Sequence, residues 1–478
     1  MQSVYCYFIL ALVLGFFNTA TTAPNRETIQ ECNLNQEIIR DIQSYQNVVN
    51  SIIDFITKGE FKGKVFQDLA LFTDTFGSRL TGTENLEHSI DYLLNLMNQY
   101  EMHNVHAENV TVPRWRRLKE YGELLSPRNA ELPVVALGSS VGTGKNGITA
   151  EVMVVKSFDE LNNKSRGEVE GKIIVYNQDW VNYDHDYDYR SKGATEASKK
   201  GAVASLVRSL TPFSMRTLYT GQQTYRNNVT KIPALCISVE DAHMLQRMQD
   251  RGNKIIIHLN VSTETLSNST SRNVIADLTG AEYPDKIVAV TAHSDSWDAG
   301  TGSMDDGGGI FMSLYALKVL KELGLKPRRT VRSLIFTGEE QCYCGVNEYN
   351  DKHASDLENF IFVMENDEGV WNPLGLNYTA GPMGGCVLKE ILKLLLPLNA
   401  TRADYVENVG SDISLWTKSL IPGTSLLNEN GKWFWFQHTQ ADTLDVIDSD
   451  QMDKALAVWA SVAYVIADMK IQFPSRFE

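Results

Sequence analysis

The second half of the chain alternates between strand-like and helix-like segments, and this alternation limits the fold more than any other feature. It begins near residue 286 with an apolar run over 287–291, predicted to be a strand, and continues with an apolar-faced helix over 307–323. Further strands are predicted at 331–336, 360–364 and 423–427, and further helices at 387–396, 411–418 and 451–469. Such an order is typical of an α/β fold, in which helices flank a sheet.

The region between residues 126 and 269 has a different pattern of predicted secondary structure. It contains one helical stretch at 195–200 and several short strand-like runs, at 134–137, 148–155, 172–176, 202–207, 232–237 and 254–259. A chain of 478 residues is long enough for two or three domains. We therefore predict a β-rich insert at 126–269, an α/β domain split into 61–125 and 270–478, and a helical segment at 24–60.

The first residues resemble a secretion signal. Residues 1–23 carry no charged side chain, and their apolar run from Phe8 to Phe17 is followed by small residues up to Ala23. This length suits a signal peptide and is short for a membrane span, and no later run of about 18 apolar residues predicts a stable one. Seven N-x-S/T triplets agree with secretion and predict glycosylation at Asn109, Asn163, Asn228, Asn260, Asn268, Asn377 and Asn399.

The cysteines do not suggest a metal site of their own. Removal of the signal peptide would take Cys6 and leave five cysteines, so at least one would be free or paired between chains. Cys342 and Cys344 are separated by one residue rather than two, and no second pair follows. A local structural role is therefore favoured for them over a zinc site.

The charge balance excludes one class of function. The chain has 44 Lys and Arg against 59 Asp and Glu, a formal net charge of −15. A nucleic-acid-binding protein needs a basic surface, so we expect no nucleic-acid partner.

Three motifs of other enzymes are absent or lack their context. Residues 138–142 match the G-x-S-x-G of serine hydrolases, with Ser140 as nucleophile, and residues 142–147 match G-x-G-x-x-G. Both need a helix to follow, and the glycine-rich stretch after Gly142 is a poor helix start. No His is followed by Glu, so the H-E-x-x-H zinc motif is absent.

Acidic and His clusters follow the predicted strands of the α/β region. The clusters lie at residues 293–298, 304–309, 337–340, 365–367 and 438–443. Ligands in open α/β sheets bind at the carboxyl ends of the strands, so these clusters are predicted to meet there.

The residue types in these clusters suit a pair of zinc ions. Each ion takes His and carboxylate ligands, two nearby ions need a bridging ligand, and a further carboxylate must stay free as general base. The chain offers five candidate ligands, His293, Asp305, Glu340, Asp367 and His438, with Glu339 as base and Asp295 as a partner for His293. Any one of these residues alone is also explained as a helix cap, a solvated carboxylate or a structural His. Their joint order favours the metal site.

These motifs together resemble the co-catalytic zinc exopeptidases, a family that includes bacterial leucyl aminopeptidases and glutamate carboxypeptidases. The similarity covers about residues 60–470 and includes 76–82, 147–152, 171–178, 293–298, 304–309 and 458–460. The resemblance implies a mixed sheet flanked by helices, and it implies that the β-rich insert is a protease-associated domain. The chain departs from the family pattern at residues 342–344, Gln437 and Gln440. We therefore expect the shape of the substrate pocket to differ from that of relatives.

The resemblance also implies a role for each candidate residue. His293 and Asp367 would hold one Zn²⁺, Glu340 and His438 would hold the other, and Asp305 would bridge the two. Glu339 would be the general base for a metal-activated water, and Asp295 the partner of His293. Independently of the resemblance, Gly410, Ser411 and Asp412 precede a predicted helix, and their N–H groups are candidates for binding a substrate terminus.

The same resemblance implies that the substrates are short peptides, chiefly dipeptides. It also implies that the protein is a homodimer that passes through the endoplasmic reticulum and Golgi and is secreted or delivered to lysosomes. Relatives carry a removable propeptide, for which residues 24–44 are the candidate segment. Two alternatives remain: a non-enzymatic receptor of the transferrin-receptor kind, which would lose metal ligands, and a serine hydrolase that uses Ser140.

Overall fold

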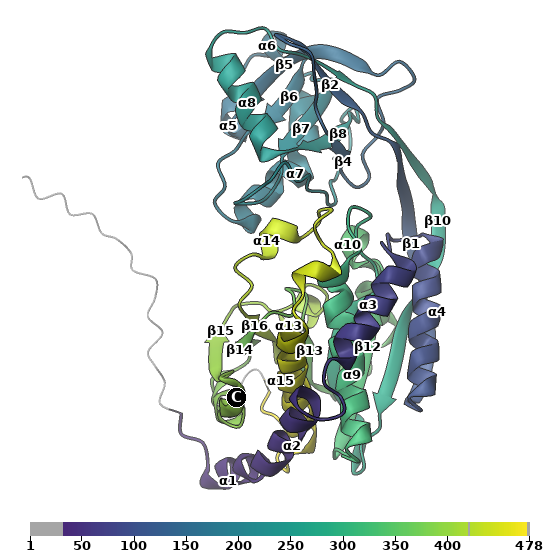
Figure 1. The fold of residues 1–478 in the computed structure, drawn as a ribbon, viewed down its shortest axis with the longest axis vertical. Coiled ribbons are helices and arrows are strands. Elements are labelled where there is room, and N and C mark those ends of the chain that lie inside the picture. Colours follow the sequence, from purple (N-terminus) through teal and green to yellow (C-terminus); the bar gives the residue numbers. More distant parts are fainter. Residues whose placement is uncertain (1–31, 419–420, 476–478) are drawn as a thin grey trace, which may run out of the picture. The chain divides into compact units, whose positions relative to one another are not determined.

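The computed structural model describes residues 32–418 and 421–475 (Figure 1). The predicted signal peptide at 1–23, together with Cys6, lies outside these residues. The chain from Leu34 onward forms one compact unit, and its described residues build two eight-stranded sheets. None of the helices described is long and apolar enough to cross a membrane.

The first sheet is mixed and belongs to the α/β part of the chain. Its central strands β12, β11, β13 and β16 are parallel, whereas β1 and β14 pair antiparallel with their neighbours β10 and β16. This confirms the predicted α/β class with a mixed sheet. In spatial order the strands are β1 (His103–Lys119), β10 (Ser262–Leu278), β12 (Arg329–Phe336), β11 (Tyr283–His293), β13 (Phe360–Glu365), β16 (Gly423–Asn428), β14 (Pro373–Thr379) and β15 (Arg402–Tyr405).

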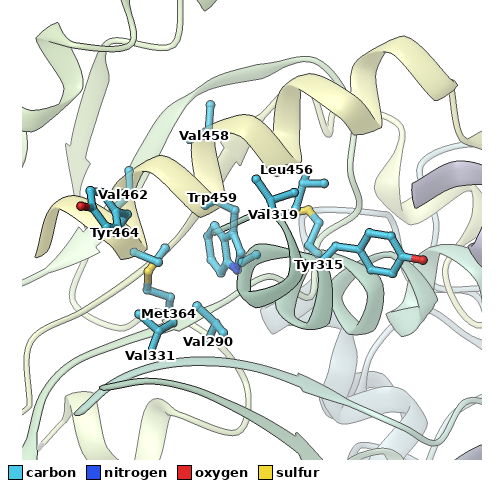
Figure 2. Packing of buried hydrophobic residues seen from close by; sticks show 14 of the residues in the cluster. Val290, Tyr315, Val319, Val331, Met364, Leu456, Val458, Trp459, Val462 and Tyr464 are labelled. Atoms are coloured by element: carbon cyan, nitrogen blue, oxygen red, sulfur yellow. The ribbon is translucent and has the colours of Figure 1, made fainter. Parts of the chain in front are cut away.

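Helices flank this sheet and fill the main core. The two central ones, α9 (Gly308–Glu322) and α15 (Ser449–Asp468), are buried on nearly every side, which explains their almost continuous apolar sequence. Figure 2 shows Trp459 of α15 extending beside α9 toward Val290 and Met364 of the sheet. The others are α1 (Gln36–Ser44), α2 (Gln46–Thr57), α3 (Lys64–Phe76), α4 (Glu84–Gln99), α10 (Glu339–Cys342), α11 (Cys344–Lys352), α12 (Pro382–Lys393), α13 (Ser414–Thr417) and α14 (Trp433–Phe436).

The second sheet, with its helices, forms the insert. Its strands in spatial order are β3 (Ala130–Glu131), β2 (Gly122–Ser126), β9 (Ile256–Leu259), β5 (Ile148–Val155), β6 (Ile173–Tyr176), β7 (Ala204–Arg208), β8 (Ala234–Ile237) and β4 (Val135–Ala136). Its helices are α5 (Phe158–Asn162), α6 (Arg166–Val169), α7 (Tyr183–Lys199) and α8 (Val239–Asp250). The insert is thus not purely β-rich, because four helices accompany the strands.

A long antiparallel ribbon, β1 with β10, leads from the first sheet to the insert (Figure 1). Its 17-residue strands were not predicted, because their outer stretches are polar and exposed and lack a regular apolar alternation. The insert boundary predicted at 126 falls at the end of β2, and the one predicted at 269 falls inside β10. Because β10 runs across the predicted boundary at 269, composition alone does not mark where the insert ends.

The helical segment predicted at 24–60 contains α1 and α2. In α2 the side chains of Val49, Ile52, Ile53 and Ile56 are buried in the main core, and this helix packs against α15. The apolar spacing noted in the sequence is therefore the face that α2 turns to the core.

A buried carboxylate on α15 gives a first prediction. Burial raises the pKa of Asp453 to about 6, and only one of its oxygens has a partner, the N–H of Gly63 at 2.9 Å. Because the folded protein holds this proton more tightly than the unfolded chain, the free energy of unfolding should fall as pH rises from about 4 to 6. Asp453→Asn should raise that free energy at pH 7.5 by about 1 kcal/mol.

Chemical denaturation at several pH values checks this expectation. The control is Asp445→Asn, an exposed carboxylate just before the same helix, which should leave this pH dependence unchanged. An Asp453→Asn protein that is less stable than the wild type at pH 7.5 would contradict the assignment.

Candidate metal centre

Five side chains from five separate segments meet at the carboxyl edge of the first sheet. His293 is the last residue of β11, and Asp367 follows β13 by two residues. The other three, Asp305, Glu340 and His438, come from the turn before α9, from α10 and from the loop after α14. The parallel strands place these distant positions together, as their sequence order predicts.

Asp305 lies between the two His side chains. Its Oδ1 is 3.3 Å from Nε2 of His293, and its Oδ2 is 3.3 Å from Nε2 of His438. Asp367 Oδ1 is 3.2 Å from the same nitrogen of His293, and Glu340 Oε2 is 3.0 Å from that of His438. The site therefore consists of two triplets that share one carboxylate.

These distances fit two zinc sites. Ligand atoms 2.0–2.1 Å from a tetrahedral zinc ion are about 3.3 Å apart, close to the 3.0–3.3 Å that separates each His nitrogen from its carboxylate oxygens. Asp305 Oδ2 and Glu340 Oε1 are buried and make no hydrogen bond within the described chain. His and carboxylate ligands in this number suit zinc.

The centre is strongly acidic. Burial and the neighbouring carboxylates, Asp367 and Glu340 first among them, raise the pKa of Glu339 well above its ordinary value. Burial lowers the pKa of His438, but the carboxylates of Glu340 and Asp305 outweigh it and raise the pKa well above the usual range. An excess of buried negative charge of this kind favours bound cations.

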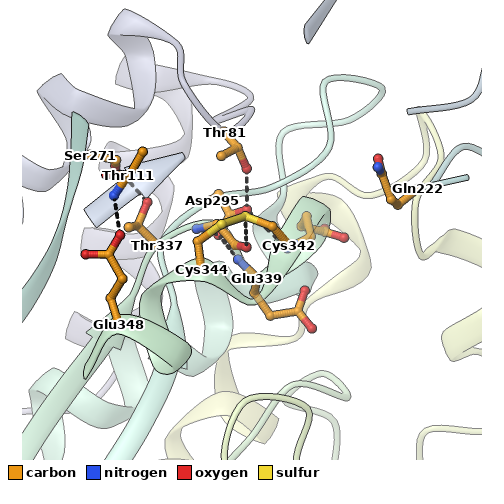
Figure 3. The surroundings of a disulfide bond; sticks show 12 residues. Thr81, Thr111, Gln222, Ser271, Asp295, Thr337, Glu339, Cys342, Cys344 and Glu348 are labelled. Atoms are coloured by element: carbon orange, nitrogen blue, oxygen red, sulfur yellow. Dashed lines mark hydrogen bonds between the residues drawn. A yellow bond between two sulfur atoms is a disulfide. The ribbon is translucent and has the colours of Figure 1, made fainter. Parts of the chain in front are cut away.

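Asp295 lies beside His293, as the prediction of a partner for that side chain requires, and its carboxylate makes further contacts. Nδ1 of His293 lies 3.0 Å from the backbone oxygen of Asp295 but 3.7 Å from its carboxylate. The carboxylate also accepts hydrogen bonds from the N–H groups of Gly338, Glu339 and Glu340 and from the hydroxyl of Thr81 (Figure 3). Asp295 thus supports His293 through its main chain and holds the start of α10 through its side chain.

Cys342 and Cys344 form a disulfide that begins two residues after Glu340 (Figure 3). The bond joins the last residue of α10 to the first of α11 and encloses Tyr343, whose φ is +52°. This agrees with the local structural role favoured from the spacing. Cys236 is free and buried.

Two buried residues that were not predicted to belong to the site hold the turn Ser303–Gly307, which carries the bridging candidate Asp305. Asp442 accepts hydrogen bonds from the N–H groups of Met304, at 2.8 Å, and Asp305, at 3.3 Å. Arg79 is fully buried and donates to the backbone oxygens of Ser294, Thr301 and Gly302. Arg79 lies in the stretch 76–82 that carries the family resemblance, and Asp442 lies in the acidic cluster 438–443. Their places in these two stretches were the only sequence signal for a role at the site.

The contact between Asp442 and the turn Ser303–Gly307 gives a second prediction. Asp442→Ala should weaken zinc affinity about 10- to 100-fold, because both N–H groups that fix Asp305 lose their acceptor. Zinc competition with a chromogenic chelator measures this. Asp445→Ala, an exposed position three residues on, is the control and should leave zinc affinity unchanged. Equal affinity in both variants would contradict the role of Asp442.

The insert contributes to the centre through a backbone contact and a shared cleft. The carbonyl oxygen of Thr220 lies 3.2 Å from Nδ1 of His438, and the Thr220 N–H donates to the carbonyl of His438. A cleft of about 510 Å³ joins the two parts. Its walls include Asp305, Glu339, Glu340, Asp367, Ser411 and His438 from the α/β part and Tyr183, Asp184, Tyr187, Arg190, Gln222 and Thr224 from the insert.

The N–H groups predicted to bind a substrate terminus are largely engaged. Glu365, the last residue of β13, accepts hydrogen bonds from the N–H groups of Ser411, at 2.7 Å, and Asp412, at 3.1 Å. The helix that follows, α13, has four residues and begins only at Ser414. The proposed use of residues 410–412 therefore fails for these two N–H groups, because a buried carboxylate already occupies them.

The serine-hydrolase alternative has no support at Ser140. This residue is buried, its hydroxyl accepts a hydrogen bond from the N–H of Ala234, and irregular chain with a turn, not a helix, follows it. The hydroxyl is therefore engaged at the start of β8, whose first residue is Ala234.

Comparisons with known proteins agree with this geometry. The family described as Peptidase family M28 matches residues 273–463. Carboxypeptidase Q from Mus musculus is 44% identical over 92% of this chain and 93% of its own, and that from Xenopus laevis is 45% identical over 91% and 92%. Among solved structures, a Peptidase M28 precursor from Shewanella amazonensis has a TM-score of 0.85 at 30% identity and covers 91% of this chain and 99% of its own. A zinc aminopeptidase from Bacillus subtilis shares the fold, with a TM-score of 0.66 at 19% identity over 87% and 98% of the chains. The resemblance to zinc exopeptidases predicted from the sequence is confirmed.

Proposed function

The chain belongs to peptidase family M28 and is a metallo-exopeptidase, and we propose that it uses two Zn²⁺ ions to hydrolyse short peptides, chiefly dipeptides. The observation that carries the proposal is the position of Asp305, with one carboxylate oxygen facing His293 and the other facing His438. His293 and Asp367 would complete one zinc site, and Glu340 and His438 the other. All five candidate ligands are present, which argues against a receptor of the transferrin-receptor kind.

Glu339 is the proposed general base. It lines the cleft beside both triplets but belongs to neither, so its carboxylate remains available for a proton. Glu339 would take a proton from the attacking water and give it to the leaving amine. When bound, the zinc ions would lower the pKa of that water and polarise the scissile carbonyl.

We further propose that the protein is secreted or lysosomal, glycosylated and homodimeric. The signal-like residues 1–23 support entry into the secretory pathway, and the seven sequons support glycosylation. Asn109, Asn163, Asn228, Asn268 and Asn399 are exposed, while Asn260 and Asn377 are half-buried. The dimer, like the propeptide and the protease-associated nature of the insert, follows from the family resemblance alone.

The test is hydrolysis of a panel of unmodified dipeptides by protein whose zinc content is measured in the same preparation. We expect about two zinc ions per chain and activity that is lost on chelation and restored by zinc. Full activity at one zinc ion or none would contradict the paired-metal proposal.

A further inference from the structure

One aromatic side chain lines the cleft in a backbone conformation that its residue type rarely adopts. Tyr343 is 47% exposed and belongs to the cleft wall. Its φ of +52° is a left-handed conformation, which is costly for a residue with a Cβ atom. Such conformations persist only where the surrounding structure enforces them, and they are concentrated at functional sites. Tyr343 is therefore a candidate for a role in the cleft.

The neighbouring residues hold Tyr343 in this conformation. The disulfide between Cys342 and Cys344 closes the main chain around Tyr343 into a small ring and lies beside Glu339 (Figure 3). The N–H of Tyr343 donates to the carbonyl of Glu339 at 3.2 Å, and the carbonyl of Tyr343 accepts the N–H of Asn347 at 3.1 Å. The disulfide and these two hydrogen bonds therefore fix the base of the Tyr343 side chain.

The ring of Tyr343 presents free apolar surface to the cleft. Its hydroxyl makes no hydrogen bond, and its ring stacks on no other ring, within the described part of the chain. A substrate side chain that covers this ring removes apolar surface from water, and an aromatic one also gains from ring–ring contact. The ring is therefore suited to pack against an aromatic side chain of the substrate.

Negative charge surrounds the phenol. The carboxylate of Glu339 and burial raise the pKa of Tyr343 far above its usual value, so the ring stays neutral, and Asp412 and Asp367 add to this effect. Asp412 is 1% exposed, and neither of its carboxylate oxygens has a hydrogen-bond partner among the described residues. Glu339 and Asp412 belong to neither ligand triplet. A dipeptide carries its positive charge at its amino end, so this side of the cleft favours the N-terminal residue of the substrate.

We propose that Tyr343, positioned by the disulfide between Cys342 and Cys344, packs against the side chain of the N-terminal residue of a dipeptide and selects aromatic residues there. This inference rests on the proposed peptidase function and adds to it a substrate class. The three residues of this segment depart from the family pattern, so the preference would be a property of this chain.

The test compares the dipeptides Phe-Ala, Ala-Phe and Ala-Ala in the wild type and in Tyr343→Ala. We expect Tyr343→Ala to lower kcat/KM for Phe-Ala about 10-fold, mainly through a higher KM, and to leave the other two nearly unchanged. Tyr343→Phe keeps the ring and should restore the preference. An equal loss on all three dipeptides, or a gain for Phe-Ala, would overturn the role of Tyr343. The ratios are measured within one preparation, so they do not depend on the fraction of folded protein.

The part played by the disulfide is tested with the double variant Cys342→Ser and Cys344→Ser. It should lose most of the preference for Phe-Ala, because Tyr343 is then free to leave the left-handed conformation. A full preference in this variant would overturn the positioning role of the disulfide. The matched control is Tyr283→Ala, since Tyr283 is 48% exposed and begins β11, at the opposite end of the strand from His293. This control should keep the full preference.

Binding measurements separate a failure of this inference from a failure of the proposed function. Calorimetry of Phe-Ala and Ala-Ala with zinc-loaded Glu339→Gln protein, with and without Tyr343→Ala, needs no turnover. Tighter binding of Phe-Ala that depends on Tyr343, without turnover in the wild type, would support Tyr343 and contradict the hydrolytic function. Turnover with the same substrate ratios in the wild type and Tyr343→Ala, or no binding of Phe-Ala at all, would overturn the role of Tyr343.

Discussion

Glu339→Gln should lower kcat by about 1,000-fold or more while the protein keeps its full zinc content. The expectation follows from the position of Glu339, which lines the cleft but belongs to neither ligand triplet. Its main chain is fixed by the 3.1 Å hydrogen bond from its N–H to Asp295, and burial raises the pKa of its carboxyl group. Gln keeps the shape and the backbone contact but cannot accept the proton.

The neighbouring residue provides the contrast. Glu340→Gln should lose activity together with zinc from one site, since Glu340 Oε2 lies 3.0 Å from Nε2 of His438. Glu322→Gln, at the exposed end of α9, should match the wild type in rate and metal content. Steady-state kinetics and elemental analysis on the same samples distinguish the three. A Glu339→Gln protein with wild-type kcat would show that another group accepts the proton.

Two of the candidate ligands, His293 and Asp367, could be predicted because each stands at or just after the end of a strand whose apolar run is plain in the sequence. His293 ends β11 and Asp367 follows β13 by two residues, and the inner parts of these two strands are buried and pair in parallel. A parallel pair places its carboxyl ends side by side, so sequence order already implied proximity. The distances within the triplets needed the structure.

The contribution of the insert could not be predicted in this way. The predicted helix at 195–200 is in fact α7, which begins at Tyr183, after Asn182 caps it by accepting the N–H of His185. Its first turns are polar and aromatic, without the apolar spacing that marks a helix in sequence. This unrecognised part of the helix carries Tyr183, Tyr187 and Arg190 into the cleft.

Residues 410–412 show the opposite error, in which a local pattern was clear but a distant side chain decided the outcome. Glycine and serine before a short helix suggest free N–H groups, as at many anion sites. Glu365 lies 46 residues earlier than Ser411 and reaches these groups first. Asp367, two residues after Glu365, is a candidate zinc ligand, so the contact holds the 411–412 loop against the strand that leads to this ligand.

Asp305→Asn should reduce the bound zinc from about two ions to less than one and abolish measurable dipeptide hydrolysis. Each oxygen of Asp305 faces a different His at 3.3 Å, and an amide offers only one oxygen and no negative charge. The wild type should also lose thermal stability on chelation, since zinc present at about 1,000 times its Kd stabilises the folded protein by about 4 kcal/mol. Asp305→Asn should unfold at the same temperature with and without added zinc.

The control for this substitution is Asp285→Asn, which lies exposed near the start of β11, the strand that ends in His293. It should bind two zinc ions and gain stability from them as the wild type does. Calorimetric unfolding, with zinc quantified before each scan, separates loss of metal from loss of fold. Because Asp305 is the one side chain shared by both triplets, a variant that kept one tightly bound ion would mean that the two sites form independently. Retention of two ions would show that Asp305 does not bridge them.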